Sequence, residues 1–159
     1  MIDYTAHIHS KIVSNEQLTK VLHQWEFKGQ KVVFTNGCFD ILHQGHVDYL
    51  AKAASLGHKL VVGLNSDNSV SRLKGTSRPI NPALSRAVVL AGLEFVSVVV
   101  VFEEDTPLEL IKNIKPQVLV KGGDYTAESV VGREYAHEVC IIPLTNGFST
   151  TGIVEKLKM

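Results

Sequence analysis

Residues 31–46 read KVVFTNGCFDILHQGH, a strand pattern that runs through a glycine-bearing turn into the start of a helix. The first six are apolar almost throughout instead of alternating, which is typical of a strand buried on both faces of a parallel sheet. Four more runs rich in Val, Ile and Leu have the same character: residues 59–65, 95–102, 117–122 and 138–144. The sequence therefore predicts five buried strands.

Helical patterns separate these runs. A capping box of Ser14 and Gln17 opens the helix before the first run. Asn81 and Thr106 are predicted caps of two later helices, each followed by a proline that suits the first helical position. Residues 126–137 form a weaker helix pattern and residues 150–157 a short one. The apolar stripes at helical spacing are Leu18, Val21, Leu22 and Trp25; Val47, Leu50, Ala51 and Ala54; Leu84, Ala87, Val88 and Ala91; and Leu110, Ile111 and Ile114.

This alternation of strands and helices predicts an α/β fold, namely a doubly wound, Rossmann-like domain. Its parallel five-stranded sheet is expected to carry helices on both faces, joined by right-handed crossovers. We expect one domain over residues 1–159, with residues 1–12 loosely ordered.

The composition excludes several classes of protein. Lys and Arg number 16, as do Asp and Glu, so there is no basic excess of the kind that nucleic acids or membrane surfaces attract. The two cysteines, Cys38 and Cys140, are too few and too far apart for a disulfide scaffold or a cysteine zinc site. No signal peptide and no apolar run of about 18 residues is present, which predicts a soluble, cytoplasmic protein.

The turn at residues 36–46 carries the strongest functional signal, although it matches neither GxGxxG nor a P-loop. Gly37 lets a ligand approach the backbone, and the amides near Gly45 lie at a helix start, which favours anions. His43 and His46 are three residues apart and therefore share one helix face. The pattern predicts a polyphosphate cradle. A zinc pair is an alternative, but helical zinc pairs usually sit at i and i+4, and no third ligand is obvious.

Together with four other segments, this turn resembles the HxGH nucleotidyltransferase superfamily, specifically its cytidylyltransferase-like branch. The matching segments are residues 43–46, 63–67, 73–80, 121–125 and 147–151. Within the branch, the set is most similar to heptose 1-phosphate adenylyltransferases, an activity often fused to a heptose kinase. The resemblance implies a standalone form, with a separate heptose kinase in the same pathway and a role in making lipopolysaccharide core or another surface heptose polymer.

The implied reaction joins ATP and D-glycero-β-D-manno-heptose 1-phosphate into ADP-heptose, releases pyrophosphate and uses Mg²⁺. The expected catalytic residues are His43, His46 and Lys74. The expected nucleotide-binding residues are Thr35, Asn36, Gly37, Cys38, Phe39, Gly45, Lys121, Gly122, Asp124, Ser149, Thr150 and Thr151. The expected substrate-binding residues are Asp40, Asn65, Asp67, Arg78 and Arg86, and Asp124 is also a candidate ligand of Mg²⁺.

Ordinary structural roles compete with these assignments. Cys38 fits a small packed residue better than a ligand contact, and Arg86 fits a surface or ion-pair residue nearly as well. Lys74 and Arg78 also fit a solvated basic loop, Asn65 and Asp67 a helix cap, Asp124 a turn, and residues 149–151 a plain N-cap.

Two other functions stay open at this point: a cytidylyltransferase for glycerol 3-phosphate or a similar alcohol phosphate, and a non-catalytic nucleotide-binding module. Pairing into a homodimer is also open, with Tyr49 and Phe95 as interface candidates that core packing explains equally well.

Overall fold

The computed structural model describes residues 1–145 and 147–157. Asn146, Lys158 and Met159, which belong to the expected domain, lie outside the described residues. Within the described part, one sheet has the strand order β1-β4-β3-β2-β5-β6, and every neighbouring pair is parallel. The strands are β1 (Ile12–Val13), β2 (Val32–Gly37), β3 (Lys59–Asn65), β4 (Val98–Phe102), β5 (Val118–Gly122) and β6 (Glu138–Ile142).

The α/β prediction is confirmed, but the sheet has six strands instead of five. The additional strand, β1, has two residues and pairs with β4 through Ile12 and Val99. Two residues are too few to show a periodic pattern, which is why sequence analysis misses them. The preceding residues, which we expected to be loosely ordered, form helix α1 (Tyr4–Ser10), whose N-cap is Asp3.

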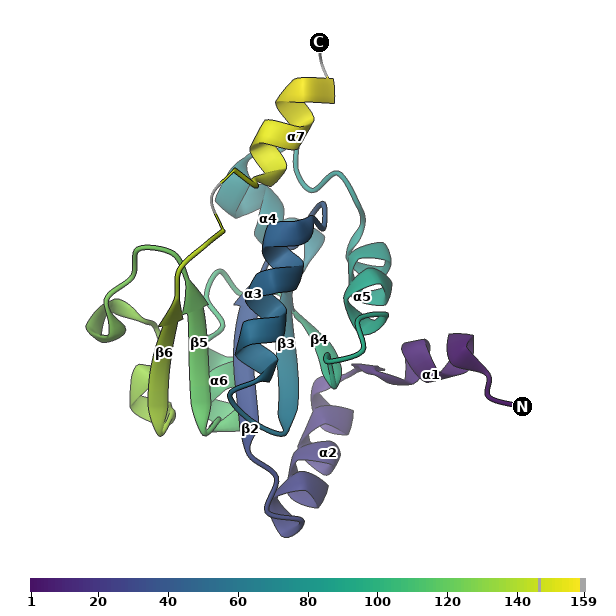
Figure 1. Ribbon diagram of the computed structural model, residues 1–159, viewed down its shortest axis with the longest axis vertical. Helices are drawn as coiled ribbons and strands as arrows, with labels where there is room; N and C mark the ends of the chain where they lie inside the picture. Colours follow the sequence, from purple (N-terminus) through teal and green to yellow (C-terminus); the bar gives the residue numbers. More distant parts are fainter. Residues whose placement is uncertain (146, 158–159) are drawn as a thin grey trace.

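Helices cover both faces of the sheet, as predicted (Figure 1). One apolar core lies between the sheet and the helices α3 (Gln44–Ala54) and α5 (Ala83–Ala91), through residues such as Leu50 and Leu90. The other core lies beneath α2 (Asn15–Phe27) and α6 (Leu108–Ile114), through residues such as Leu18 and Ile111. The predicted capping box of Ser14 and Gln17 opens α2, and the last helix, α7 (Thr150–Leu157), has the predicted bounds.

The helix predictions differ from the structure in four further places. Helix α4 (Asp67–Lys74) was not predicted, because its polar sequence leaves only a short apolar pattern, although Ser66 caps it. Residues 126–137 form two short 3₁₀ helices, η1 (Ala127–Ser129) and η2 (Arg133–Tyr135), instead of one α-helix. Helices α5 and α6 begin one residue late, with Pro82 and Pro107 at the N-cap positions. The Asn81 side chain donates to the Asp40 carbonyl and therefore does not cap α5.

The strand order reverses beside β2. The chain passes from β2 to β3 and β4 on one side, and β5 and β6 are added on the other side. In open parallel sheets, such a switch point leaves a crevice at the carboxyl ends of the two central strands. The fold therefore places the exits of β2 and β5 side by side. None of the helices in the described residues is long and apolar enough to cross a membrane.

Candidate active site

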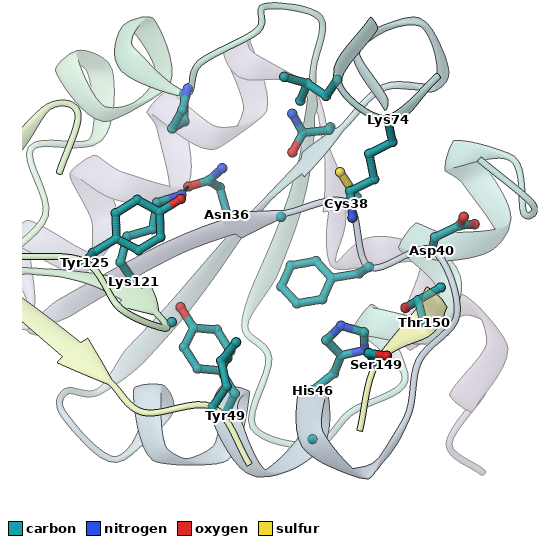
Figure 2. A pocket seen from close by; sticks show the side chains of 18 of the residues that line it. Asn36, Cys38, Asp40, His46, Tyr49, Lys74, Lys121, Tyr125, Ser149 and Thr150 are labelled. Atoms are coloured by element: carbon teal, nitrogen blue, oxygen red, sulfur yellow. Dashed lines mark hydrogen bonds between the residues drawn. The ribbon is translucent and has the colours of Figure 1, made fainter. Parts of the chain in front are cut away.

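A cavity of about 620 Å³ opens at this switch point. Its walls come from the exits of β2 and β5, the starts of α3 and α7, the end of α4 and the turn between β4 and α6 (Figure 2). Most of the residues that sequence analysis assigned to a site line this cavity. They are Asn36, Gly37, Cys38, Phe39, Asp40, His43, Gly45, His46, Asn65, Lys74, Lys121, Gly122, Ser149, Thr150 and Thr151.

The two imidazoles stack against each other at the start of α3. His43 occupies the N-cap position, and its side chain makes no capping hydrogen bond. The ring centroids of His43 and His46 lie 3.8 Å apart with an interplanar angle of 19°. Both Nδ1 atoms are buried and have no hydrogen-bond partner among the described residues. Since buried polar atoms are nearly always paired, two unpaired nitrogens in one place indicate that this pair of rings has a role other than stabilising the fold.

Burial also sets the charge of this pair. Burial lowers the pKa of His43, and it is the main reason why the pKa of His46 falls from 6.5 to about 4. The neighbouring His43 and Lys74 lower the pKa of His46 further. Both rings are therefore neutral at neutral pH, and each has one N–H donor. A bound anion would raise both pKa values, because it favours the charged imidazole.

Gly45 keeps this cradle open. A Cβ atom at residue 45 would lie 3.0 Å from the Phe148 Cβ and 3.2 Å from the His43 Nδ1. Any side chain there would press the His43 ring out of place. This geometry agrees with the sequence argument that Gly45 removes a blocking group between the two histidines.

Two lysines supply positive charge along the cavity. The Lys121 Nζ donates to the Asn36 Oδ1 at 2.8 Å and lies 5.8 Å from the centre of the Tyr125 ring. Burial lowers the pKa of Lys121. Lys74 stands at the end of α4, is exposed, and reaches the cavity from the side opposite Lys121 (Figure 2). A polyanion that entered the cavity would meet both ammonium groups.

The start of α7 forms the wall next to the histidines. The Ser149 Oγ accepts a hydrogen bond from the Gly152 amide at 3.0 Å, so this serine acts as a helix cap. The Thr150 Oγ1 donates to the Ile41 carbonyl at 3.4 Å, which ties α7 to the turn before α3. The capping alternative therefore holds for Ser149, and residues 149–151 still line the cavity.

Asp40 has its hydrogen-bonding capacity used by the protein itself. It is 4% exposed, and its carboxylate accepts from the Arg78 Nη1 at 2.7 Å. The same carboxylate accepts from the backbone amides of Ile80 at 2.8 Å and Asn81 at 3.0 Å. Asp40 therefore fixes the loop before α5, although it was expected to bind substrate.

Arg86 differs from its substrate-binding assignment, whereas the ion-pair alternative is confirmed by its pairing with Asp67. It is 2% exposed and does not line the cavity, so it is neither a surface residue nor in reach of a substrate there. Its guanidinium donates to four acceptors from separate segments: the carbonyls of Cys38, Asn65 and Asn81, and the Asp67 carboxylate. Arg86 thus ties the exits of β2 and β3 together behind the cavity wall. We call Asp40, Asp67, Arg78 and Arg86 the ion-pair frame.

Two further expected site residues lie elsewhere. Thr35 is fully buried, and its Oγ1 lies 2.6 Å from the Tyr49 hydroxyl, so it supports the wall from behind. Asp124 is exposed and outside the cavity lining. The structure thus brings together the histidine turn, Lys74, Lys121 and the start of α7, whereas Thr35, Asp67, Arg78, Arg86 and Asp124 do not line the cavity.

Comparison with known proteins agrees with this geometry. The model of the cytidylyltransferase-like family matches residues 34–156, which include every part of the cavity wall named above. The chain belongs to the cytidylyltransferase-like family. The family resemblance inferred from the motifs is thereby confirmed.

Curated relatives extend this family assignment. The chain is 58% identical over 152 residues to the bifunctional protein HldE of Helicobacter hepaticus, and this aligned region covers 96% of this chain and 31% of that protein. It is 58% identical over 156 residues to the bifunctional protein HldE of Campylobacter concisus, and this aligned region covers 98% of this chain and 32% of that protein. The chain therefore spans about a third of the length of these relatives.

Two solved structures share the fold. A lipopolysaccharide core biosynthesis protein from Thermoplasma volcanium is 30% identical and matches with a TM-score of 0.60 over 73% of this chain and 97% of that chain. A pantoate-beta-alanine ligase from Francisella tularensis, solved with an ATP ligand and beta-alanine, matches with a TM-score of 0.61 over 92% of this chain and 76% of that one. The second is 16% identical and shows the fold alone.

Several residues that line the cavity of this cytidylyltransferase-like domain were missed by sequence analysis. Tyr125 and Phe148 lie within segments that were singled out for the resemblance, but they were given no role, and Asp105 directly precedes the predicted helix cap Thr106. Tyr49 lies three residues after His46, so helical spacing would have pointed to it. The complete set of missed residues is Tyr49, Leu73, Asp105, Thr106, Pro107, Tyr125, Ser129, Val130, Val131, Leu144, Thr145 and Phe148.

The residues described do not form a protein-made metal site. No cluster of three or more His, Cys, Asp or Glu side chains suited to a metal ion occurs among residues 1–145 and 147–157. The Asp40 carboxylate pairs with Arg78, and the Asp105 carboxylate pairs with Arg72 at 2.7 Å. These residues do not fit a zinc pair, and they do not fit Mg²⁺ held by Asp124 and other carboxylates.

Proposed function

We propose that this chain is a heptose 1-phosphate adenylyltransferase, which forms ADP-heptose and pyrophosphate from ATP and D-glycero-β-D-manno-heptose 1-phosphate. The observation that carries the proposal is the stacked pair of neutral imidazoles whose buried Nδ1 atoms lack partners at the start of α3. Membership of the cytidylyltransferase-like family and 58% identity to bifunctional HldE proteins support the same reaction class. The similar structure of a lipopolysaccharide core biosynthesis protein supports a heptose as the acceptor sugar.

The reaction is a substitution at phosphorus. An oxygen of the sugar 1-phosphate attacks the α-phosphorus of ATP in line, the new P–O bond forms, and the bond to the β-phosphate breaks. The bonding electron pair leaves with pyrophosphate, so no covalent enzyme intermediate is needed. Catalysis of this kind rests on positioning the reactants and on stabilising the negative charge that develops in the transition state.

The residues of the cavity suit these two tasks. His43 and His46, together with the amides at the start of α3, would donate hydrogen bonds to the triphosphate. Lys74 would add positive charge near the leaving group, and the start of α7 would bind phosphate oxygens from the opposite wall. Asn36, Lys121 and Gly122 would bind the nucleoside, and Asn65 would contact the sugar. The ion-pair frame would hold these segments in register without touching substrate.

Mg²⁺ enters the proposal only as the companion of ATP. In nucleotide sites this ion is often bound through phosphate oxygens, waters and at most a few carboxylates. We therefore expect activity in enzyme treated with EDTA to return when Mg²⁺ is added. Full turnover without a divalent cation would remove Mg²⁺ from the scheme.

Two further expectations belong with the proposal. A heptose kinase has to supply the sugar 1-phosphate, and we place both steps in the cytoplasm, where ATP is available. The small-molecule substrates are the only partners that the reaction requires, and whether two copies of the chain pair is a separate question that analytical ultracentrifugation answers.

Pyrophosphate release tests the proposed function directly. The purified chain is assayed with ATP or CTP against heptose 1-phosphate or glycerol 3-phosphate. Release with ATP and heptose 1-phosphate supports the proposal. Release only with CTP and glycerol 3-phosphate would overturn it in favour of a cytidylyltransferase, and tight nucleotide binding without any turnover would leave a binding module.

A further inference from the structure

Phe39 lies between the exit of β2 and the two histidines at the start of α3. Its backbone conformation is unusual. Its φ angle is 43°, in the left-handed region that bulky side chains rarely adopt. The residue is 7% exposed, lines the cavity and belongs to the apolar core beneath α3. Such a conformation persists only where the surrounding structure holds it in place.

Both neighbours of Phe39 are held by the ion-pair frame. The Cys38 carbonyl accepts from the Arg86 Nη1 at 2.6 Å. The Asp40 carboxylate accepts from Arg78 and from two backbone amides of the loop before α5. The backbone on each side of Phe39 is thus fixed, which explains how the left-handed conformation is maintained.

The Phe39 ring fills the space between Gly37 and His46. Its centroid lies 5.4 Å from that of the His46 ring, with an interplanar angle of 71°, so the two rings meet edge to face. A Cβ atom at Gly37 would lie 2.9 Å from the Phe39 Cε2 and 3.1 Å from its Cζ. Gly37 does not have a positive φ, so its own backbone would accept a side chain. Glycine is therefore required at residue 37 by the Phe39 ring.

We propose that Phe39 is a positioning residue whose ring, locked between Gly37 and His46, sets the orientation of the His46 imidazole in the cavity. The ring meets the His46 imidazole edge to face, so it acts on catalysis through His46. Burial is the largest cause of the low pKa of His46, and the Phe39 ring is one of the groups that bury it. His43 and Lys74 are the charged or titratable neighbours that also lower this pKa.

The orientation itself does not depend on which substrates the enzyme uses. Its consequence for turnover does rest on the proposed function. The experiment therefore needs one readout without substrate and one with substrate.

A double-mutant cycle between Gly37 and Phe39 provides the test. The variants are Gly37→Ala, Phe39→Ala and the double variant, with Phe39→Leu added in case Phe39→Ala folds poorly. The first readout is the pKa of His46, followed by NMR of its ring protons in the free protein. The second readout is kcat for pyrophosphate release.

We expect the pKa of His46 to rise from about 4 towards 6.5 in Gly37→Ala, Phe39→Ala and Phe39→Leu. Each single substitution should lower kcat by on the order of 10- to 100-fold, because a small misplacement of a catalytic group has a large effect on rate. The double variant should be no worse than Phe39→Ala, since removing the ring makes room for the new methyl group.

The chain contains a matched control. Phe34 is fully buried in the other core, beneath α2 and α6, and meets Gly63 in the same way: a Cβ at Gly63 would lie 2.9 Å from the Phe34 Cζ. Phe34→Leu should lower stability while leaving the pKa of His46 and kcat unchanged, because it lies outside the cavity lining.

Three results would overturn the proposal. An unchanged pKa of His46 in folded Phe39→Leu would show that the ring does not set its environment. Equal effects of Phe39→Leu and Phe34→Leu on both readouts would show a general packing role. A further loss of kcat on adding Gly37→Ala to Phe39→Ala would show that Gly37 serves the ligand directly. If the wild-type protein releases no pyrophosphate, the proposed function fails, while the NMR readout still decides the role of Phe39.

Discussion

Two polar clusters with buried atoms lie next to each other at the same edge of the sheet, and their hydrogen bonding differs. In the ion-pair frame, Asp40 accepts from three donors and Arg86 donates to four acceptors. In the histidine pair, neither Nδ1 atom has a partner among the described residues. A satisfied cluster stabilises the fold, whereas an unsatisfied one is held ready for a ligand. On the proposed function, the contrast separates residues that support the site from residues that act in it.

The largest expected effect is on stability, at Arg86. Arg86→Ala leaves the carbonyls of Cys38, Asn65 and Asn81 without their donor and removes the partner of Asp67. Leaving a buried acceptor without its donor costs about 1–3 kcal/mol, and three carbonyls lose theirs in this variant. Chemical denaturation should show this loss in the free energy of unfolding.

Arg86→Lys is the matched control for this prediction. Lysine keeps the charge but cannot reproduce the planar fork of donors, so most of the loss should persist. Full stability in Arg86→Lys would mean that charge alone matters, and a stable Arg86→Ala would remove the frame from the account.

His46→Ala should have the opposite profile. The ring makes no hydrogen bond through its buried Nδ1 atom, so its removal should change the melting temperature little. Loss of one donor to a transition-state phosphate typically lowers kcat on the order of 10²–10³-fold. Pyrophosphate-release kinetics and thermal melts of the same preparation measure both. A variant that is unfolded at the temperature of the kinetic assay would assign His46 to structure.

The comparison also predicts a pH dependence of stability. The pKa of His46 is about 4 in the folded protein and 6.5 as its ordinary value, so between these values the unfolded chain binds the proton more readily. Stability is therefore lost as the pH falls from about 6.5 to about 4. His46→Gln should reduce this slope when the free energy of unfolding is measured across the range.

The exposed His23 provides the control for this slope. His23→Gln should keep the wild-type pH dependence. An identical slope in wild type, His23→Gln and His46→Gln would show that the burial of His46 has no energetic consequence.

The smallest expected effect concerns Thr35. Thr35→Val removes the hydroxyl that lies 2.6 Å from the Tyr49 hydroxyl and leaves that group buried without its partner. The free energy of unfolding should fall by about 1–3 kcal/mol. The KM for ATP should stay near that of wild type, because Thr35 does not line the cavity. A large rise in KM with unchanged stability would restore Thr35 to the nucleotide-binding residues.

The sequence could predict the features that depend on neighbouring residues in the chain. Apolar runs and helical stripes are local patterns, so the strands β2 to β6 and the bounds of α7 follow from them. The histidine turn is also local, because His43, Gly45 and His46 meet within one helical turn. Strand β1 is too short to show a pattern, and α4 is too polar.

The role of Arg86 lies beyond any local pattern. Nothing in the residues around it shows that the β2 turn, the end of β3 and the start of α4 converge on one guanidinium. Its charge and its place on a helix after a strand predicted a substrate-binding residue, with a surface or ion-pair role as the alternative, and only the existence of an ion pair is confirmed. Only the tertiary arrangement shows that the protein itself accepts four hydrogen bonds from the Arg86 guanidinium.

The central claim is that the stacked imidazoles bind the triphosphate of ATP. A titration of the protein with ATP, followed through the ring NMR signals of His43 and His46, tests it most directly. The account predicts that both sets of signals shift on binding, that both pKa values rise, and that His43→Ala and His46→Ala each weaken ATP binding. ATP that binds tightly while the signals and pKa values of both rings stay unchanged would contradict it.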